Sequence, residues 1–311
     1  MFTRIIALFA LIACLQAFTQ PSRADTRVAL VIGNGTYVNA PRLANPRNDA
    51  DDVAAALKRS GFDIISGMDM DKTAMEDAVV RFARATRNAD VAVFYYSGHA
   101  IQFAGLNYLA PVDIKLTDEA DLRRMVRLDG IVGDLEQAKN LRILVLDACR
   151  DNPLADELKR SIGSSRALPL QRGLAKFDTP QGTIVSYATQ VGRTAEDGVG
   201  RNSPYTRSFL KHIEEQEEIG TIFRRVSSDV YEATNHEQLP ELSLSLIGEF
   251  YLRGRLELKV PLTAAPTVDP AARAWEATQN TTSQAVLEDF IRQFGSTVYG
   301  SMARARLDEL S

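Results

Sequence analysis

Residues 90–99 read DVAVFYYSGH, and residues 141–150 read LRILVLDACR. In both stretches an apolar run of strand length is followed at once by small and polar residues. Such runs are typical of strands buried on both faces, as in a parallel sheet. Each stretch therefore predicts a buried strand that ends next to chemically reactive side chains.

Similar apolar runs recur along the chain and alternate with stretches of helical period. Strands are predicted at 27–32, 62–66, 90–96, 141–146, 182–187 and 242–252. Helices are predicted at 48–59 with Asn48 as cap, at 72–87, at 118–139 with Thr117 as cap and an interruption near Gly130, at 203–215 and at 221–234. This alternation predicts βαβ units, and hence an α/β fold whose mostly parallel sheet is covered by helices on both faces.

His99 and Cys149 lie just after two of the predicted strands. Open parallel sheets form their sites outside the carboxyl ends of the strands. If these two strands are neighbours, the imidazole and the thiol come within reach of each other, and a base can then activate a nucleophile. The plain alternatives are a histidine satisfied in a turn and a small buried cysteine. We favour the pair, because His212 and His236 fall elsewhere, in an amphipathic helix and a polar loop.

The N-terminal 24 residues differ from the rest of the chain. A short basic start precedes an apolar run at 5–15, which is shorter than the roughly 20 residues that span a bilayer but typical of a secretory signal. We expect cleavage after Ala24, and an exported, periplasmic or secreted protein with Cys149 as its single cysteine. The alternative is a lipid anchor on Cys14, since residues 11–14 resemble a lipoprotein box.

Composition excludes several classes of protein. The chain is 45% hydrophobic and 24% charged, which is ordinary for a globular protein and unlike a disordered chain or one with many membrane spans. Its 36 Lys and Arg against 40 Asp and Glu leave no basic excess to neutralise a phosphate backbone. We therefore expect no nucleic-acid partner and no stable membrane span, and look for a peptide or protein substrate.

The residues that follow the two strands carry a family resemblance. Tyr96-Ser97-Gly98-His99, with Leu146-Asp147-Ala148-Cys149-Arg150 placed 50 residues later from His to Cys, resembles the caspase and metacaspase superfamily of cysteine peptidases. The resemblance extends from Val28 to about Leu252 and is narrower still to exported bacterial caspase-family proteins of the peptidase C14 type. It implies a three-layer αβα sandwich and a cysteine-type endopeptidase with Cys149 as nucleophile and His99 as base.

The resemblance also implies an oxyanion hole made by the backbone N–H groups of Cys149 and Ala100. Ala100 stands where the family usually has glycine, which would strain the chain if that position needs a positive φ. Asp147 and Asp151 also depart from the caspase signature, in which Gln and Gly flank the Ala-Cys-Arg core. A caspase fold kept only for binding, as a scaffold, is therefore the alternative to an active peptidase.

Two acidic residues, Asp49 and Asp147, match positions at which metacaspases bind a basic side chain. Two carboxylates in a partly dehydrated pocket complement a guanidinium and repel an acidic substrate, so we expect cleavage after Arg or Lys. Asp49 is equally explained as a charge at a helix start, and Arg193 and Arg201 keep the alternative of cleavage after Asp open. By resemblance, further substrate-binding residues are Ser97, Ala188 and Thr189.

A basic segment follows the cysteine, at residues 151–180. For an enzyme that cuts after basic residues this is a natural self-cleavage linker, and a solvated loop is the equal alternative; its basic residues are Lys159, Arg160, Arg166, Arg172 and Lys176. The chemistry requires no cofactor. Calcium enters as an activator by resemblance alone, because Asp118, Glu119 and Asp121 offer oxygen ligands without the spacing of a defined calcium loop.

The composition changes again after the predicted peptidase domain, which we place at 25–258. Residues 259–272 are rich in Pro, Ala and Thr and predict a stiff linker. Residues 273–311 resemble one tetratricopeptide-like helical hairpin. Because a single repeat cannot bury its apolar face alone, we expect it to dock on the main domain or on a protein partner.

Overall fold

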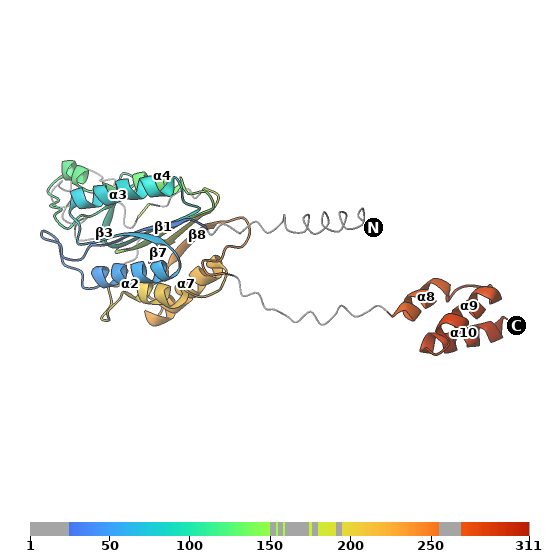
Figure 1. Cartoon of the computed structure of the whole chain (residues 1–311). Helices are drawn as coiled ribbons and strands as arrows, with labels where there is room; N and C mark the ends of the chain where they lie inside the picture. Colours follow the sequence, from blue (N-terminus) through green and yellow to red (C-terminus); the bar gives the residue numbers. More distant parts are fainter. Residues whose placement is uncertain are drawn as a thin grey trace, which may run out of the picture. The chain divides into compact units, whose positions relative to one another are not determined.

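The computed structural model describes residues 25–149, 154, 158, 174–175, 180–190, 195–254 and 269–310. The chain forms two compact units, one ending at Leu256 and one beginning at Glu257 (Figure 1). Three parts of the sequence analysis lie outside the described residues: the predicted signal segment, the residues directly after Cys149, and most of the basic segment. The side chain of Cys149 is also outside them.

The first unit is built on one mixed sheet. Its strands lie in the order β2-β1-β3-β6-β7-β8. They are β1 (Arg27–Gly33), β2 (Asp63–Met68), β3 (Val91–Phe103), β6 (Leu141–Cys149), β7 (Thr183–Tyr187) and β8 (Glu241–Ser245). All neighbours pair in parallel except β8, which pairs with β7 in antiparallel fashion at the edge. The predicted mostly parallel sheet is therefore confirmed.

Helices cover both faces of this sheet, as Figure 1 shows. One face carries α2 (Pro46–Arg59), α6 (Pro204–His212) and α7 (Ile219–Ala233), and the other carries α3 (Lys72–Thr86) and α4 (Leu128–Leu135). The alternation of side chains along β3 explains the two layers: Val91, Val93 and Tyr95 enter the first core, and Ala92, Phe94 and Tyr96 the second. This arrangement is the expected three-layer αβα sandwich.

β3 is longer than the sequence predicts. It continues through His99 to Phe103 and turns back into β4 (Leu106–Leu109). His99 is the last residue of β3 that pairs in parallel with β6, and Ala100 is the first that pairs with β4. Polar residues at this point therefore mark a change of pairing partner rather than the end of the strand.

Two further local predictions were wrong. The predicted helix at 118–139 is divided into a 3-10 helix η1 (Glu119–Arg124), a short strand β5 (Val126–Arg127) and α4, because β4 pairs with residues 126–127. Asn48 does not cap α2. The helix begins at Pro46, since proline is well suited to a first turn, and the Asn48 side chain instead donates to the carbonyl of Arg201.

The second unit contains three helices around a small apolar cluster. These are α8 (Pro270–Thr278), α9 (Gln284–Phe294) and α10 (Val298–Glu309), and Leu287, Phe290 and Ala303 are buried between them. α8 begins three residues before its predicted start, because Asp269 caps it and Pro270 occupies its first turn. Within the part of the chain that the structure describes, no helix is both long and apolar enough to cross a membrane.

Candidate functional site

His99 and Cys149 lie side by side in the sheet. β3 and β6 are parallel neighbours, and His99 and Cys149 form the last pair of their register, after Ser97 with Asp147 and Gly98 with Ala148. The two residues therefore share the carboxyl edge of two adjacent parallel strands, where open α/β sheets place their sites. The backbone placement meets the condition that the sequence set for a Cys-His pair.

The His99 side chain is buried, and only one of its ring nitrogens has a partner. Nε2 lies 2.8 Å from the carbonyl oxygen of Pro41, which can only accept, so Nε2 carries the hydrogen. Nδ1 is buried and has no hydrogen-bond partner among the described residues. Burial lowers the pKa of His99, against the opposing effect of the Pro41 carbonyl. The ring is therefore neutral at neutral pH, with a free lone pair on Nδ1.

Two buried carboxyl groups lie on the α2 and α6 side of the same edge. Asp49, in the first turn of α2, accepts a hydrogen bond from Ser97 Oγ at 3.2 Å and one from the Ser203 backbone N–H at 3.1 Å. Asp147, on β6, accepts from Ser203 Oγ at 2.5 Å and from Thr206 Oγ1 at 2.7 Å. The N-terminus of α6 thus holds both carboxyl groups in place.

These carboxyl groups have unusual acidities because no basic side chain among the described residues is paired with them. Burial, together with the charge of Asp147, raises the pKa of Asp49 to about 8. Burial also raises the pKa of Asp147 to about 6, although hydrogen bonds from Ser203 and Thr206 oppose the shift. At neutral pH the pair therefore retains about one proton, which an incoming cation would displace.

Sequence reasoning missed two further acidic residues at this site. Glu196 and Asp197 line the same pocket as Ser97, Asp147 and Ser203. Asp197 is held over it, because its carboxylate accepts the Ala44 N–H at 2.7 Å and its carbonyl accepts from the Asn45 side chain. The cavity left beneath is about 10 Å³, the room of about one water molecule. The signal in the sequence was two adjacent acids in the loop after β7, which also contains Arg193 and Arg201.

The comparison with protein families identifies the domain that carries this edge. The model of the caspase domain, which describes the C14 peptidases, matches residues 26–251. The chain belongs to the caspase-domain family. The matched region comprises the whole first unit of the described fold, from β1 to the bridge at Tyr251. At the level of the family, the first unit is therefore a caspase-like peptidase domain.

Two curated mammalian proteins are similar to part of this chain. The human mucosa-associated lymphoid tissue lymphoma translocation protein 1 is 27% identical over 152 residues, which are 46% of this chain and 18% of that protein. Its mouse homologue is 27% identical over 148 residues, 45% of this chain and 17% of that protein. The chain thus matches less than a fifth of the length of either relative.

The remaining predicted site residues of the caspase domain fall in different places. Ser97 lines the acidic pocket and donates to Asp49. Ala188 is buried in the core, where its backbone N–H binds the Leu146 carbonyl and its carbonyl accepts from Gln238. Thr189 is fully buried, and its hydroxyl has no hydrogen-bond partner among the described residues. Of these three, the structure brings only Ser97 to the acidic pocket.

The oxyanion position can be judged from the backbone. Ala100 lies in β3, and the described non-glycine residues with positive φ are Asp69, Ala104, Asn235 and His236. Ala100 therefore adopts ordinary strand geometry, and alanine incurs no conformational penalty there. The strain expected from the missing glycine does not occur. The glycine that the site does require is Gly98, where an added Cβ would lie 2.7 Å from the Tyr37 hydroxyl.

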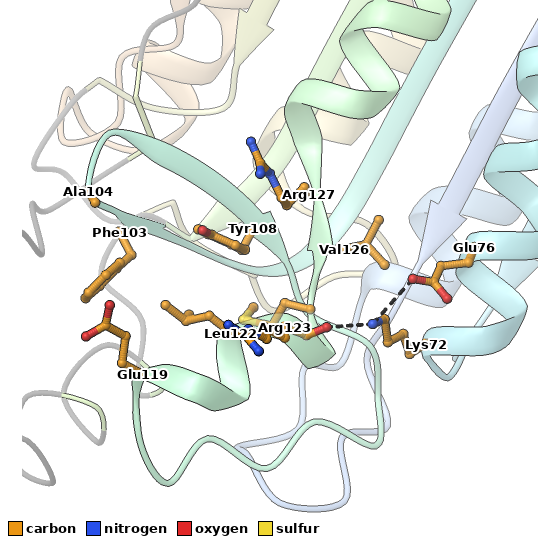
Figure 2. A pocket seen from close by; sticks show the side chains of 11 residues that line it. Lys72, Glu76, Phe103, Ala104, Tyr108, Glu119, Leu122, Arg123, Val126 and Arg127 are labelled. Atoms are coloured by element: carbon orange, nitrogen blue, oxygen red, sulfur yellow. Dashed lines mark hydrogen bonds and ion pairs between the residues drawn. The ribbon is translucent and has the colours of Figure 1, made fainter.

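A larger cavity lies further along β3, beyond the turn into β4. It encloses about 600 Å³ between the β3–β4 turn, η1 and the start of α3, and shares no residue with the acidic pocket (Figure 2). At one side of it, Lys72 donates to the Arg123 carbonyl at 2.6 Å and lies 3.4 Å from Glu76, one turn further along α3. None of the predicted catalytic or specificity residues lines this cavity.

The acidic residues considered for calcium have local roles. Asp118 accepts the Ala120 N–H at the start of η1, and Asp121 accepts from both the N–H and the hydroxyl of Thr117. Among the residues that the structure describes, no group of three or more His, Cys, Asp or Glu side chains is placed to hold a metal ion. Calcium activation stays a prediction.

Proposed function

We propose that this caspase-domain protein is a cysteine endopeptidase that cleaves after Arg or Lys, with Cys149 as nucleophile and His99 as base. The observation that carries the proposal is the register pair of His99 and Cys149, at the edge where the buried Asp49 and Asp147 also lie. The family match supports peptidase chemistry in general, and the acidic groups support the choice of substrate.

The proposed reaction uses the free nitrogen of His99. Nδ1 takes the thiol proton of Cys149 as its sulfur bonds to the peptide carbonyl carbon. Backbone N–H groups, by resemblance those of Cys149 and Ala100, stabilise the oxyanion. Collapse breaks the C–N bond, and His99 returns the proton to the leaving amine. Water, deprotonated by His99, then attacks the thioester, which releases the new carboxyl group and restores the thiol.

Selectivity for a basic residue follows from charge. Asp49 and Asp147 are buried without a cationic partner among the described residues, and Glu196 and Asp197 add two more acids to the pocket wall. A guanidinium or ammonium group would neutralise these acids, and the attraction would offset the cost of removing its charge from water. An acidic side chain would be repelled. The alternative of cleavage after Asp loses one of its arginines, since Arg201 is bound bidentately by Asp52; Arg193 lies outside the described residues.

One observation favours the second candidate, a catalytically weak scaffold. The acidic cavity holds about one water molecule, too little for an arginine side chain, because the segment around Asp197 is bound to Ala44 and Asn45. An active peptidase therefore requires this segment to move away from the pocket. We infer that the protein is exported, and that calcium or cleavage within the basic segment activates it by promoting this movement.

The test is cleavage of short fluorogenic peptides that place Arg, Lys or Asp before the reporter, with and without calcium. We expect release after Arg and Lys, and none after Asp. Cys149→Ala, which removes the single cysteine of the chain from residue 25 on, should abolish it. Mass spectrometry of the incubated protein reports self-cleavage at the basic segment.

Other outcomes discriminate between the candidates. Release after Asp alone would retain the Cys-His pair and refute the roles of Asp49 and Asp147. Silence with every peptide, with calcium and after limited trypsin cleavage of the basic segment, would favour the scaffold. The helices of the second unit would then be the next object of study.

A further inference from the structure

Two buried tyrosines bind the backbone of His99 from opposite directions. The Tyr37 hydroxyl accepts the His99 N–H at 2.8 Å, and the Tyr96 hydroxyl donates to the His99 carbonyl at 2.7 Å. Tyr37 is 2% exposed and Tyr96 is fully buried. Burial raises the pKa of Tyr37 well above its ordinary value, so its hydroxyl stays neutral and available as an acceptor.

The sheet topology explains why a side chain performs this role. β1 ends at Gly33, opposite Ser97. The Asn34 N–H donates to the Ser97 carbonyl, which is the last backbone hydrogen bond between the chain after β1 and β3. Backbone groups two residues apart in a strand point to the same side, so the His99 N–H points beyond the end of β1. A buried N–H without an acceptor is costly, and the Tyr37 hydroxyl occupies the place that the strand has left.

The segment that carries Tyr37 also controls the imidazole itself. The Tyr37 ring packs against the His99 ring, with centroids 4.5 Å apart and planes inclined by 40°. Four residues later, Pro41 supplies the carbonyl that accepts the Nε2 hydrogen. The loop after β1 thus contacts His99 at its N–H, at its ring face and at Nε2, and leaves Nδ1 without a partner among the described residues.

The loop is itself firmly placed. Asn34 is fully buried, donates to the Ala110 carbonyl at 3.0 Å and accepts the Met70 N–H at 2.9 Å. The Asp69 carboxylate accepts the N–H groups of Gly35 and Thr36, both at 2.9 Å. Tyr37 follows Thr36 directly, so the hydrogen bonds of the preceding loop residues fix the position of its ring against His99.

Gly98 adds an independent sign that the two hydroxyls matter. A Cβ at this position would lie 2.7 Å from the Tyr37 hydroxyl and 2.8 Å from the Tyr96 hydroxyl. Real Cβ atoms do not approach so closely, so the hydroxyls can reach the His99 backbone only because residue 98 has no side chain. The Gly-His sequence and the two tyrosines therefore form one structural unit.

We propose that Tyr37 is a positioning residue for catalysis: its hydroxyl fixes the His99 backbone and its ring fixes the imidazole with Nδ1 free to take the Cys149 proton. This inference rests on the proposed peptidase function. The tyrosine touches neither substrate nor thiol in this role. It acts by limiting the orientations of the base, which is how a small error in placement becomes a large loss of rate.

The test compares Tyr37→Phe, which retains the ring, with Tyr37→Leu, which loses both ring and hydroxyl. We expect kcat to fall about 10-fold for Y37F and about 100-fold for Y37L, with KM unchanged because the acidic pocket is intact. Tyr187→Phe is the matched control. It also removes a buried hydroxyl, which donates to the Ala175 carbonyl at 3.2 Å in the core on the α3 and α4 side of the sheet, and it should leave kcat unchanged.

A second readout does not depend on peptidase activity. ¹⁵N chemical shifts of the His99 ring, recorded against pH in the Cys149→Ala background, report its tautomer and its pKa. The wild type and Y37F should show the hydrogen on Nε2 and a His99 pKa below the ordinary value of a histidine. Y37L should lose this single tautomer, and its pKa should rise, because the ring that buries the imidazole is gone.

The outcomes separate the two proposals. If Y37L retains both the wild-type kcat and the wild-type titration of His99, the positioning role is refuted. If the wild type cleaves no peptide, the proposed function fails, and the titration alone decides the inference. Should Y37L not fold, Y37F decides the inference, because it retains the ring: a wild-type kcat in Y37F would refute the role of the Tyr37 hydroxyl.

Discussion

Two clusters of titratable side chains, both involving α6, handle charge in opposite ways. At the start of the helix, Ser203 and Thr206 hold the buried Asp147, and Ser203 also binds Asp49, with no basic side chain among their described partners. At its end, the buried His212 lies between two carboxylates. Nδ1 is 2.8 Å from Glu215 and Nε2 is 2.9 Å from Asp229.

The second cluster is complete in itself. Arg225 also binds Glu215, and Lys211 also binds Asp229 at 2.6 Å. The hydrogen bond from Lys211 lowers the pKa of Asp229. Hydrogen bonds from His212 and Arg225 lower that of Glu215 in spite of its burial. Cations and carboxylates here neutralise each other, which is the ordinary arrangement for charges inside a protein.

The first cluster has no cation among the described residues. The carboxyl groups of Asp49 and Asp147 have raised pKa values where those of Glu215 and Asp229 are lowered. Within the described part of the chain, His99 has one nitrogen without a partner, whereas both nitrogens of His212 are paired. Buried polar groups left incomplete in this way cluster at functional sites. The contrast fits the proposed binding of a basic substrate at the edge of β3 and β6, whereas the end of α6 pairs its charges internally.

The sharpest test of this contrast exchanges the two histidines for glutamine, one at a time. His99→Gln should lower kcat/KM for Arg peptides by about 10³-fold, since a positioned base contributes 10²- to 10⁴-fold. Its melting temperature should fall only modestly, because the glutamine amide can still donate to the Pro41 carbonyl in place of Nε2, although the ring contact with Tyr37 is lost. Peptide kinetics and thermal unfolding on the same samples measure both. An H99Q variant that cleaves as fast as the wild type would remove the functional side of the comparison.

The second largest effect concerns Asp147. Asp147→Asn retains the shape and the hydrogen bonding of the carboxyl group but not its charge, so kcat/KM for Arg and Lys peptides should fall about 10²-fold, mainly through KM. Alkylation of Cys149 by iodoacetamide should be unchanged, as the dyad is intact. Asp129→Asn, which removes an exposed carboxylate paired with Arg127, is the control. Equal KM values in D147N and the wild type would refute the acidic pocket.

The fold was more predictable than the site, for a physical reason. Every strand of the main sheet was located from the apolar runs, because burial on both faces leaves a strong pattern in the sequence. Where tertiary pairing decides, the pattern failed: residues 126–127 form β5 only because β4 lies beside them. The Pro41 carbonyl and the Tyr37 hydroxyl could not be predicted either, since a loop reveals its partners only after it is folded.

Among the site residues, the sequence located those that follow strands and missed those on loops. His99, Cys149 and Asp147 lie on β3 and β6, and strand order with register is sufficient to bring them together. Asp197 and Glu196 reach the pocket through a loop that is fixed by Ala44, Asn45 and Gln238. Such contacts between distant segments leave no periodic signal.

The third prediction uses pH. The folded protein holds a proton on Asp49 up to a pKa of about 8, whereas an unfolded carboxyl group has released it by about pH 4. The folded state therefore binds more protons between these values, and its stability falls as pH rises through this window. The asparagine in Asp49→Asn has no carboxyl proton to release, so this contribution to the pH dependence of stability is absent from the variant. Its stability relative to the wild type should therefore increase from pH 5 to pH 8, by about 1.4 kcal/mol per pH unit at most.

Thermal unfolding of both proteins between pH 5 and pH 8 measures this trend. Asp52→Asn, one turn along α2, is the matched control with the opposite sign. Hydrogen bonds from Arg201 lower the pKa of Asp52, so the carboxylate already makes its full contribution to the free energy of unfolding at pH 5. The difference in stability between D52N and the wild type should therefore stay constant from pH 5 to pH 8. Parallel curves for D49N and the wild type would mean that Asp49 is not protonated at neutral pH.

The smallest effect is expected at the other end of α6. His212→Gln removes one ring from between two carboxylates that retain Arg225 and Lys211, so the loss should be about 2 kcal/mol, or about 6 °C in melting temperature. Cleavage of Arg peptides per folded molecule should be unaffected, because Ser203 and Thr206 at the start of the helix still hold Asp147. His236→Gln, which alters an exposed histidine, controls for the substitution itself. If H212Q instead raised KM while it left stability unchanged, the paired cluster would be acting on the acidic pocket through α6, and the separation of the two clusters into structure and function would be wrong.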